Sequence, residues 1–334
     1  MPLKQKILAL LTAQAPRGGY LSGEALAEQL GVSRAAVWKA INALRAGGCQ
    51  IEAVTNRGYA LAGGDFLDPG AIAPLLRCDI PGLQIEVSTT LPSTNTALRA
   101  RAQSGAPEGL VLLAAEQTEG RGRAGRDFYS PAGTGLYLSL LLRPVCATAD
   151  APLLTLAAAT AAAEAIEEVT GQSPAIKWVN DLLLGGKKIC GILTEAALSL
   201  ESGGLEYAVL GFGLNLAPPD GGFPAPLADI AGALYPSAAD IPSGTRCRLA
   251  AAFLSHLWPY CQNLPARAFL AGYRQRLAWQ GQRITVLPSP GQTAGEATLL
   301  GIDNAGRLRV RRPDDSEETL SGGEVRLLGV PAAP

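Results

Sequence analysis

The chain has 334 residues, of which 48% are hydrophobic and 17% are charged. This composition excludes extensive disorder, and the length exceeds what one compact core usually covers, so we expect two or three domains. The formal net charge of −1 indicates no class of partner for the chain as a whole.

The sequence carries no evident signal for a membrane, for secretion or for a metal. No apolar run of about 18 uncharged residues suggests a bilayer span, and the N-terminus lacks the apolar segment of a secretion signal. The six cysteines form no C-x-x-C pair, so we expect reduced thiols and no metal site. The single histidine, His256, lies in an apolar helix-like run and is interpreted as structural. We therefore expect a cytoplasmic chain with no membrane partner.

Residues 1–64 have the pattern of a winged helix-turn-helix. They carry seven Lys and Arg against three Asp and Glu, which gives a net charge of +4. Ser22 and Ser33 can each cap a helix, and glycines 47 and 48 would end the second helix after about residue 45. The residues expected on the apolar faces of these helices are Ala25, Leu26, Leu30, Val37, Ile41 and Leu44.

Residues 50–54 and 59–61 predict two strands around a tight turn, which would form a basic wing. In such a module the second helix enters the major groove of DNA, and cations of the wing hold phosphates. DNA contacts are expected from polar residues of the turn, the second helix and the wing, namely Ser33, Arg34, Lys39, Asn42 and Arg57. The alternative is a helix-turn-helix that is retained for protein contacts.

The rest of the chain predicts two further domains, so the expected fold class is a multidomain α/β (α+β) protein. Residues 65–275 alternate strand-like and helix-like segments, which indicates a mixed α/β domain after a linker, a short helix and a strand. Residues 281–330 predict a small antiparallel barrel. The expected strands lie at 111–115, 136–142, 189–195 and 207–214 and, in the barrel, at 283–287, 296–302, 308–311 and 317–320; the expected helices lie at 151–170 and 249–257.

A glycine- and arginine-rich segment, GRGRAGR at 120–126, is the most informative feature of the middle domain. Glycines let the backbone turn through positive φ and approach a ligand closely, and arginines supply fork-shaped donors to phosphate or carboxylate. A tract that touches RNA nonspecifically is the alternative. The segment occurs once, between apolar strand-like runs, so we expect a loop that closes over anionic oxygens.

The segment around this loop, EQTEGRGRAGRDFYSPAGTGLYLSL at 116–140, closely resembles the signature of the biotin protein ligases, also called biotin-[acetyl-CoA-carboxylase] ligases. PSTN at 92–95, KWVND at 177–181 and KKICGIL at 187–193 agree with it in order and spacing. The resemblance extends over nearly the whole chain. It implies an SH3-like C-terminal barrel, and the first module resembles the operator-binding domain of the bifunctional ligase repressors.

The resemblance implies an ATP-dependent enzyme that uses Mg²⁺ and biotin. Such a ligase joins the biotin carboxylate to the α-phosphate of ATP, forming biotinyl-5′-AMP, and passes biotin to a lysine of the biotin carboxyl carrier protein of acetyl-CoA carboxylase. It also implies a repressor of biotin synthesis genes, with the adenylate as corepressor and a ligand-promoted homodimer on operator DNA. Both partners in the first step are anions, so cations must offset their repulsion.

Site residues follow from the same resemblance. The catalytic set is Arg121, Arg123, Lys188 and Asp181. The biotin-binding set is Ser93, Thr94, Asn95, Gln117, Arg121, Gly122, Arg123, Lys188 and Gly191. The ATP and adenylate set is Arg123, Arg126, Lys177, Asn180, Lys188 and Asn215. The chain departs from the family at Val179, where proline is usual, and at 217–226, where the match is poor, so the adenine-stacking residues are not assigned.

Several points stay open at this stage. Arg126, next to Asp127, can form a structural ion pair instead of binding the nucleotide, and Trp178 can belong to the core instead of the biotin pocket. A lipoyl ligase shares the chemistry, although the arginine loop and the small C-terminal domain favour biotin. The remaining alternatives are a ligase with a vestigial helix-turn-helix and a biotin-sensing DNA-binding regulator without catalysis.

Overall fold

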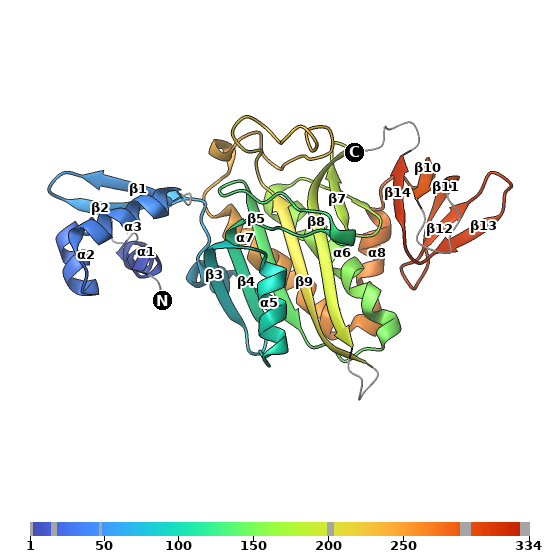
Figure 1. The fold of residues 1–334 in the computed structure, drawn as a ribbon, viewed down its shortest axis with the longest axis horizontal. Coiled ribbons are helices and arrows are strands. Elements are labelled where there is room, and N and C mark those ends of the chain that lie inside the picture. Colours follow the sequence, from blue (N-terminus) through green and yellow to red (C-terminus); the bar gives the residue numbers. More distant parts are fainter. Residues whose placement is uncertain (1–2, 15–18, 47–48, 199–203, 288–294, 328–334) are drawn as a thin grey trace.

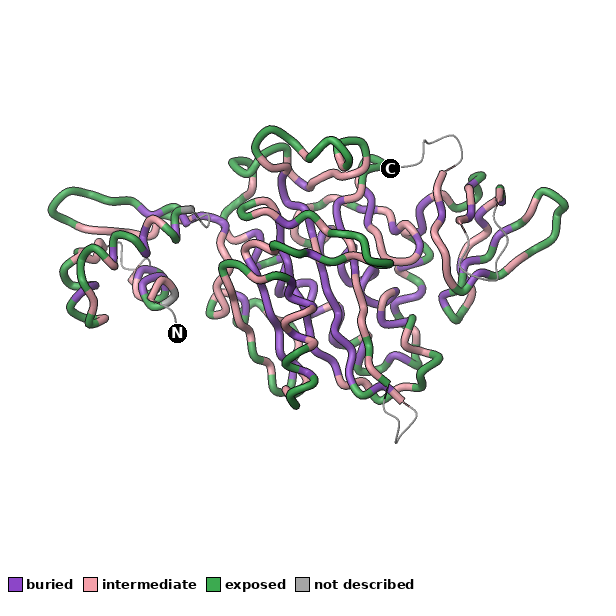
Figure 2. The backbone as a smooth tube through the Cα atoms, in the orientation of Figure 1, coloured by how far each residue is buried: buried purple, intermediate pink, exposed green. Residues whose placement is uncertain are grey.

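The computed structural model describes residues 3–14, 19–46, 49–198, 204–287 and 295–327. Three modules follow one another along the long axis: a helical module with a two-stranded wing, a large central sheet with helices, and a small sheet (Figure 1). Buried residues are concentrated on the central strands and on the helices packed against them (Figure 2). The mixed α/β expectation is confirmed.

The N-terminal module contains α1 (Leu3–Gln14), α2 (Gly23–Leu30), α3 (Arg34–Ala46), β1 (Cys49–Val54) and β2 (Gly58–Gly64). Ser22 accepts a hydrogen bond from the Ala25 amide, and Ser33 accepts one from the Ala36 amide, so both predicted caps are confirmed. The antiparallel β1–β2 pair is the predicted wing. The predicted helix stop at glycines 47 and 48 lies outside the described residues.

The core of this module differs from the expectation in two respects. Helix α1 was not predicted, yet its Ile7 and Leu11 are at most 1% exposed and pack with Val37 and Ile41 of α3. In α2 the prediction of Ala25 on the apolar face is wrong, because Ala25 is exposed and Ala27 is buried instead. The added helix α1 packs on both α2 and α3, and it therefore decides which face of α2 is covered.

The central sheet has seven strands in the order β3-β4-β5-β9-β8-β7-β6. Only the β3–β4 pair is parallel, and the other pairs are antiparallel. The strands are β3 (Gln84–Leu91), β4 (Leu110–Gln117), β5 (Gly135–Leu142), β6 (Ala175–Lys177), β7 (Asp181–Leu184), β8 (Lys187–Leu198) and β9 (Leu205–Asn215). Each predicted strand of this domain is found, with ends shifted by at most three residues.

Helices cover both faces of this sheet. Alternating side chains of β4 separate the two cores: Val111 and Leu113 pack with α6 (Ala151–Thr170), α7 (Thr245–Gln262) and α8 (Phe269–Gln275), whereas Leu110 and Leu112 pack with α5 (Thr94–Gln103). A short helix, α4 (Pro69–Ile72), precedes β3 as the linker pattern predicted. The start of α5 thereby lies beside the ends of β4 and β9, where the site forms.

Helix α6 is the expected buried helix. The segment 148–170 is long and apolar enough to cross a membrane by length and composition, but 67% of its most apolar window is buried inside the fold. Its small alanine side chains allow α7 and α8 to pack closely against it. It is the core helix of the central module.

The C-terminal module contains β10 (Arg283–Leu287), β11 (Gly295–Ile302), β12 (Leu308–Arg311), β13 (Glu317–Leu320) and β14 (Glu324–Leu327). These strands form one antiparallel sheet in the order β13-β12-β11-β10-β14. Strand β14 was not predicted. The SH3-like barrel is not confirmed, because within the described part of the module the edge strands β13 and β14 each pair on one side only.

His256 joins two helices of the central module, and the cysteines are free thiols. His256 bridges α7 to α6, with Nε2 2.8 Å from Glu168 and Nδ1 3.5 Å from Glu164. All six cysteines are free, and burial raises the pKa of the Cys49 thiol to about 12. Burial also raises the pKa of the other five thiols.

Candidate active site

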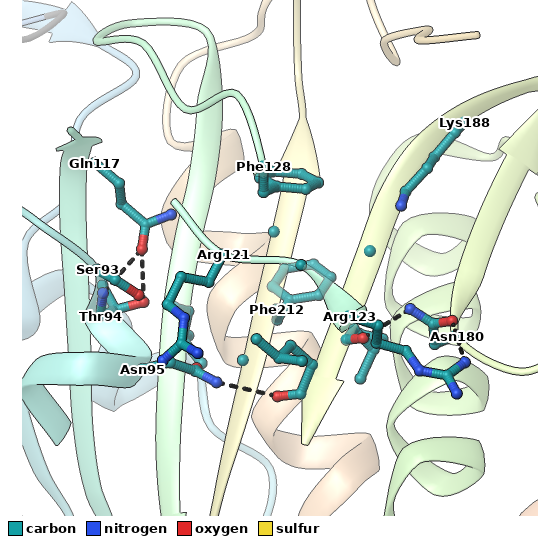
Figure 3. A pocket seen from close by; sticks show the side chains of 17 residues that line it. Ser93, Thr94, Asn95, Gln117, Arg121, Arg123, Phe128, Asn180, Lys188 and Phe212 are labelled. Carbon is teal, nitrogen blue, oxygen red and sulfur yellow. Dashed lines mark hydrogen bonds between the residues drawn. The ribbon is translucent and has the colours of Figure 1, made fainter. Parts of the chain in front are cut away.

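A narrow pocket opens where the start of α5, the end of β4, the arginine loop and strands β8 and β9 meet (Figure 3). It encloses about 50 Å³. Its walls are formed by Ser93, Thr94, Asn95, Gln117, Arg121, Gly122, Arg123, Phe128, Leu138, Asn180, Lys188, Gly191, Ile192, Leu193, Gly211, Phe212 and Gly213. All nine residues predicted to bind biotin line this one pocket.

One end of the pocket is neutral, polar and tightly bonded. The Thr94 amide and hydroxyl donate to Gln117 Oε1 at 2.8 and 3.1 Å, and Gln117 Nε2 donates to Ser130 Oγ at 3.0 Å. Ser93 Oγ caps α5 by accepting from the Thr96 amide at 3.4 Å. The chain thus fixes several uncharged donors and acceptors within a small volume, as a buried polar ligand requires.

Asn95 is held by residues that the sequence analysis did not select. Ser139 Oγ donates to Asn95 Oδ1 at 2.6 Å, and Asn95 Nδ2 donates to the Leu193 carbonyl at 3.2 Å and to Glu195 at 3.0 Å. A Cβ at Gly211 would lie 2.3 Å from Asn95 Oδ1, so glycine is needed there. The single serine in the apolar β5 sequence GLYLSLLL was the available signal for Ser139.

The arginine loop lies across the pocket. Ala124 and Gly125 adopt φ values of 55° and 74°, which turn the loop back on itself. Arg121 pairs with Glu195 at 3.2 Å, and Arg123 donates to Asn180 Oδ1 at 3.1 Å. Both predicted cations therefore face the pocket and are tied to its walls.

The third arginine of the loop points elsewhere. Arg126 donates to Glu324 of β14 at 2.5 Å, which makes it an ion pair with the C-terminal module. Within the described residues, the ion pair of Arg126 is formed with Glu324 and not with its neighbour Asp127. Glu324 also lies 3.6 Å from the Lys177 ammonium, so this carboxylate collects two of the predicted nucleotide-binding cations.

Lys188 lines the pocket, and Asp181 lies beside it without lining the pocket. The Lys188 ammonium lies 2.7 Å from Asp181 Oδ1, although this buried oxygen receives no hydrogen bond of good geometry. A charge contact at this distance does not need an ideal angle, so the two groups form an ion pair. The same ammonium lies 5.9 Å from the centre of the Phe128 ring, so Lys188 spans the space between the arginine loop and β7.

Two aromatic rings, Phe128 and Phe212, form the apolar walls, and the sequence analysis selected neither (Figure 3). A Cβ at Gly213 would lie 2.7 Å from the Phe128 ring, and one at Gly191 would lie 3.3 Å from it. Glycines at these positions therefore let the aromatic ring lie close to the strands. The signal available in the sequence was the position of these glycines. Gly213 lies two residues after Gly211, and Gly191 lies within the KKICGIL segment.

Three predicted nucleotide-binding residues do not line the pocket. Asn215 donates to the Gly232 carbonyl at 3.0 Å, Lys177 lies over the Trp279 ring at 5.9 Å, and Arg126 pairs with Glu324. Trp178 belongs to the core, because its indole N–H donates to the Gly306 carbonyl at 2.9 Å. The other three residues assigned to the nucleotide, Arg123, Asn180 and Lys188, all line the pocket.

The winged module presents a basic outer surface. Ser33, Arg34, Lys39 and Arg57 are exposed, and Asn42 is half-buried. Arg57 stacks on Tyr20 at 4.3 Å, which supports the wing. Trp38 is 61% exposed on the outer face of α3 and was not selected from the sequence.

Comparison with known families divides the chain as the fold does. Residues 87–215 match the model of the biotin/lipoate A/B protein ligase family, residues 4–60 an HTH domain, and residues 281–328 a biotin protein ligase C-terminal domain. The central match covers β3 to β9 and thus most of the pocket.

Curated relatives and solved structures agree. The bifunctional ligase/repressor BirA of Bacillus subtilis is 38% identical over 66% of this chain and 68% of its own. The biotin--[acetyl-CoA-carboxylase] ligase of Paracoccus denitrificans is 33% identical over 65% of this chain and 90% of its own. The biotin protein ligase of Aquifex aeolicus, solved with biotin and ATP, superimposes with a TM-score of 0.60 at 24% identity, covering 73% of this chain and 98% of that one, which shows a shared fold.

Proposed function

The chain belongs to the biotin protein ligase family, and from this premise we propose that it forms biotinyl-5′-AMP from biotin and ATP. The adenylate then gives biotin to a lysine of the biotin carboxyl carrier protein of acetyl-CoA carboxylase. The observation that carries the proposal is the pocket itself, which joins a neutral polar end to a cationic end through aromatic walls.

The neutral end suits the ureido group of biotin. The Thr94, Gln117 and Ser130 groups are uncharged and already fixed by one another, so binding costs little reorganisation of these side chains. Ser93, Thr94 and Asn95 are each at most 3% exposed. Asn95 also donates to the Glu195 carboxylate, which pairs with Arg121.

The pocket must open before a ligand enters. It encloses about 50 Å³, well below the roughly 300 Å³ of typical small-molecule sites. The Arg121–Glu195 and Arg123–Asn180 contacts hold the arginine loop over it. We propose that ligand binding exchanges these two contacts for contacts with the carboxylate and the phosphate.

The cationic end offsets the repulsion of the first step. The carboxylate oxygen of biotin attacks the α-phosphorus of ATP, and pyrophosphate leaves. Arg121, Arg123 and Lys188 supply charge-assisted donors to the oxygens of this transition state. Mg²⁺ enters the proposal as the counter-ion that ATP carries, because the described residues offer no cluster of three or more metal-ligating side chains and Asp181 is occupied by Lys188.

Asp181 completes the second step. An incoming lysine must lose a proton before its amine attacks the acyl carbon, and AMP leaves as the amide bond forms. When Lys188 turns toward the adenylate phosphate, Asp181 loses its partner and can accept that proton. The contact between the half-buried Asp181 carboxylate and Lys188 supports this proposal.

The first experiment is a turnover assay of the purified protein with ATP, Mg²⁺ and biotin, with lipoate in a parallel reaction. Pyrophosphate release and acyl transfer to a carrier domain are measured. Biotin-dependent turnover is expected. Turnover with lipoate alone would move the assignment to a lipoyl ligase, and ligand binding without pyrophosphate release would leave a sensor that does not catalyse.

We also propose that the winged module represses biotin synthesis genes by binding operator DNA as a homodimer, with the adenylate as corepressor. The exposed cations of α3 and of the wing support this proposal. Replacing Arg34 and Lys39 with alanine should abolish operator binding, measured by fluorescence anisotropy, and leave biotinylation intact. Unchanged DNA affinity would indicate a vestigial module.

A further inference from the structure

A buried ion pair lies between the winged module and the central module. The side chains of Asp65 and Arg246 are 6% and 8% exposed, and their charged atoms are 2.6 Å apart. Arg246 also donates its backbone N–H to Asp65 Oδ1 at 2.7 Å and its Nη1 to the Asp65 carbonyl at 2.8 Å. The two residues are therefore bonded through both backbone and side chain.

On one side, this pair holds the chain as it leaves the wing. Asp65 follows β2 directly, and the Gly64 amide donates to Ser243 Oγ at 3.0 Å. The Gly244 amide donates back to the Gly64 carbonyl at 3.1 Å. The end of the wing is thus attached to the start of α7 by hydrogen bonds.

On the other side, Arg246 holds the base of the arginine loop. Its Nε donates to the Gly135 carbonyl at 2.9 Å, and its Nη2 donates to the Gly133 carbonyl at 2.6 Å. Between them, the Thr134 carbonyl accepts from the Leu216 and Ala217 amides at 2.8 and 3.0 Å. The segment 131–135 therefore anchors both the loop that carries Phe128 and the loop that follows β9.

The link from this segment to the pocket is short. The Tyr137 hydroxyl donates to the Pro131 carbonyl at 3.0 Å, and the Tyr137 ring meets Phe128 edge to face, with centroids 6.5 Å apart. Ser130 Oγ accepts from Gln117 Nε2. A shift of the segment would move one aromatic wall and the partner of Gln117 together.

Stability alone does not explain a charge pair at this place. A buried ion pair commonly adds little stability compared with apolar side chains of the same volume. The interface around it is also loosely packed, with a cavity of about 200 Å³ lined by residues of both modules, Leu8, Leu44, Val87 and Arg246 among them. The directed hydrogen bonds, not apolar packing, define the geometry here.

We infer that Arg246, held by Asp65, is a positioning residue for the biotin pocket that sets the base of the arginine loop from the end of the wing. This inference rests on the proposed function. It predicts that biotin binding is sensed at residues 64–68, and that loss of the pair weakens biotin binding more than it slows the chemical step.

The test uses the full chain with both charges removed, Asp65→Leu with Arg246→Met, so that no buried charge is left alone. Arg246→Lys is the conservative variant, since lysine keeps the charge but cannot reach both carbonyls as a fork. Arg143→Met is the matched control, because Arg143 donates to the Ala102, Ala106 and Glu206 carbonyls at the opposite end of β5. Thermal melting confirms that each variant is folded.

Calorimetry of biotin binding and steady-state pyrophosphate release are the readouts. The double variant should bind biotin at least about tenfold more weakly and raise its KM equally, with kcat at saturating biotin changed by less than about threefold. Arg246→Lys should fall between the double variant and the wild type. Arg143→Met should keep the wild-type biotin affinity. A folded double variant with wild-type affinity overturns the inference.

Hydrogen exchange tests the link to the wing. Biotin should slow amide exchange at residues 64–68 in the wild type and should not do so in the double variant. No change in the wild type would refute this link. The proposed function fails separately, if the wild type neither binds biotin nor releases pyrophosphate with it.

Discussion

The neutral end of the pocket and the predicted nucleotide end, which extends beyond the pocket, differ in how their residues are held. At the neutral end, Thr94 bonds to both Gln117 and Ser139, and Gln117 bonds to Ser130, so these partners all belong to the central module. At the predicted nucleotide end, Arg126 and Lys177 lie outside the pocket lining and are turned toward Glu324 of the C-terminal module. The hydrogen-bond partners of the first set lie in the central module, and the charged partner of the second set lies in a neighbouring module.

This difference predicts that the biotin end is preorganised and that the nucleotide end is assembled. A preorganised site binds with little loss of entropy, whereas an assembled site can respond to what the second module does. Lys188 and Arg123 both line the pocket, where we propose that negative charge develops in the first step. Variants of these residues should therefore have the largest effects.

The strongest prediction concerns Lys188. Lys188→Ala should slow pyrophosphate release by about 100- to 1000-fold, the usual loss when one preorganised electrostatic group is removed. Lys187→Ala is the control, because Lys187 is exposed and donates to the Ala228 carbonyl. A Lys188→Ala enzyme with near-normal pyrophosphate release would show that the cationic end lies elsewhere.

Arg123 should govern how long the adenylate stays bound. Arg123→Gly removes a charged donor worth about 1.5–3 kcal/mol, so the adenylate should dissociate about 10- to 150-fold faster. Leaked adenylate would then modify lysines of bystander proteins, which mass spectrometry can count. Arg126→Gly, a change of the same kind three residues later, should have a much smaller effect because that side chain is bound to Glu324. Equal effects of both changes would remove the distinction between the two arginines.

The sequence predicts the biotin end better than the nucleotide end for a physical reason. The neutral residues come from contiguous motifs, and the register of β4, β5 and α5 brings these motifs together. Glu195 and Glu324 act across modules or strands, and the Arg126–Glu324 contact joins residues 198 positions apart. Such a contact is decided by how two modules dock, which no local pattern reveals.

The other differences between the prediction and the structure have separate causes. Helix α1 had a usable signal, since Ile7, Leu8 and Leu11 stand at helical spacing and are all buried. Strand β14 is short and follows two glycines, and its place beside β10 depends on long-range pairing. Asp65 and Arg246 carry no motif, because their role follows from the docking of the wing on α7.

Exchanging the charges of Arg126 and Glu324 tests whether the nucleotide end is assembled by the C-terminal module. Arg126→Glu or Glu324→Arg alone should raise the KM for ATP by no more than about fivefold, because exposed ion pairs contribute about 1 kcal/mol or less. The double exchange should restore part of this loss. The KM for biotin should not change in any of the three variants, and a parallel rise would contradict the separation of the two ends.

The smallest effect expected is a pH dependence of the stability that the Arg126–Glu324 ion pair contributes. Burial opposes ionisation of Glu324, but the hydrogen bond from Arg126 and the charges of Lys177 and Arg326 outweigh it and lower the pKa of this carboxyl below its usual 4.5. A lowered folded-state pKa means that the stabilisation is fully present above the usual value and is lost as the pH falls through the lowered one.

Glu324→Gln should therefore be less stable than the wild type at pH 7, by at most about 1 kcal/mol because Arg126 is largely exposed. The difference in melting temperature should shrink as the pH is lowered below 4.5, the usual pKa of the group. Arg126→Met, which keeps the carboxylate but removes its principal donor, should reduce this pH dependence. A difference between wild type and Glu324→Gln that stays constant across this range would mean that the carboxylate stabilises the module by its shape and not by its charge.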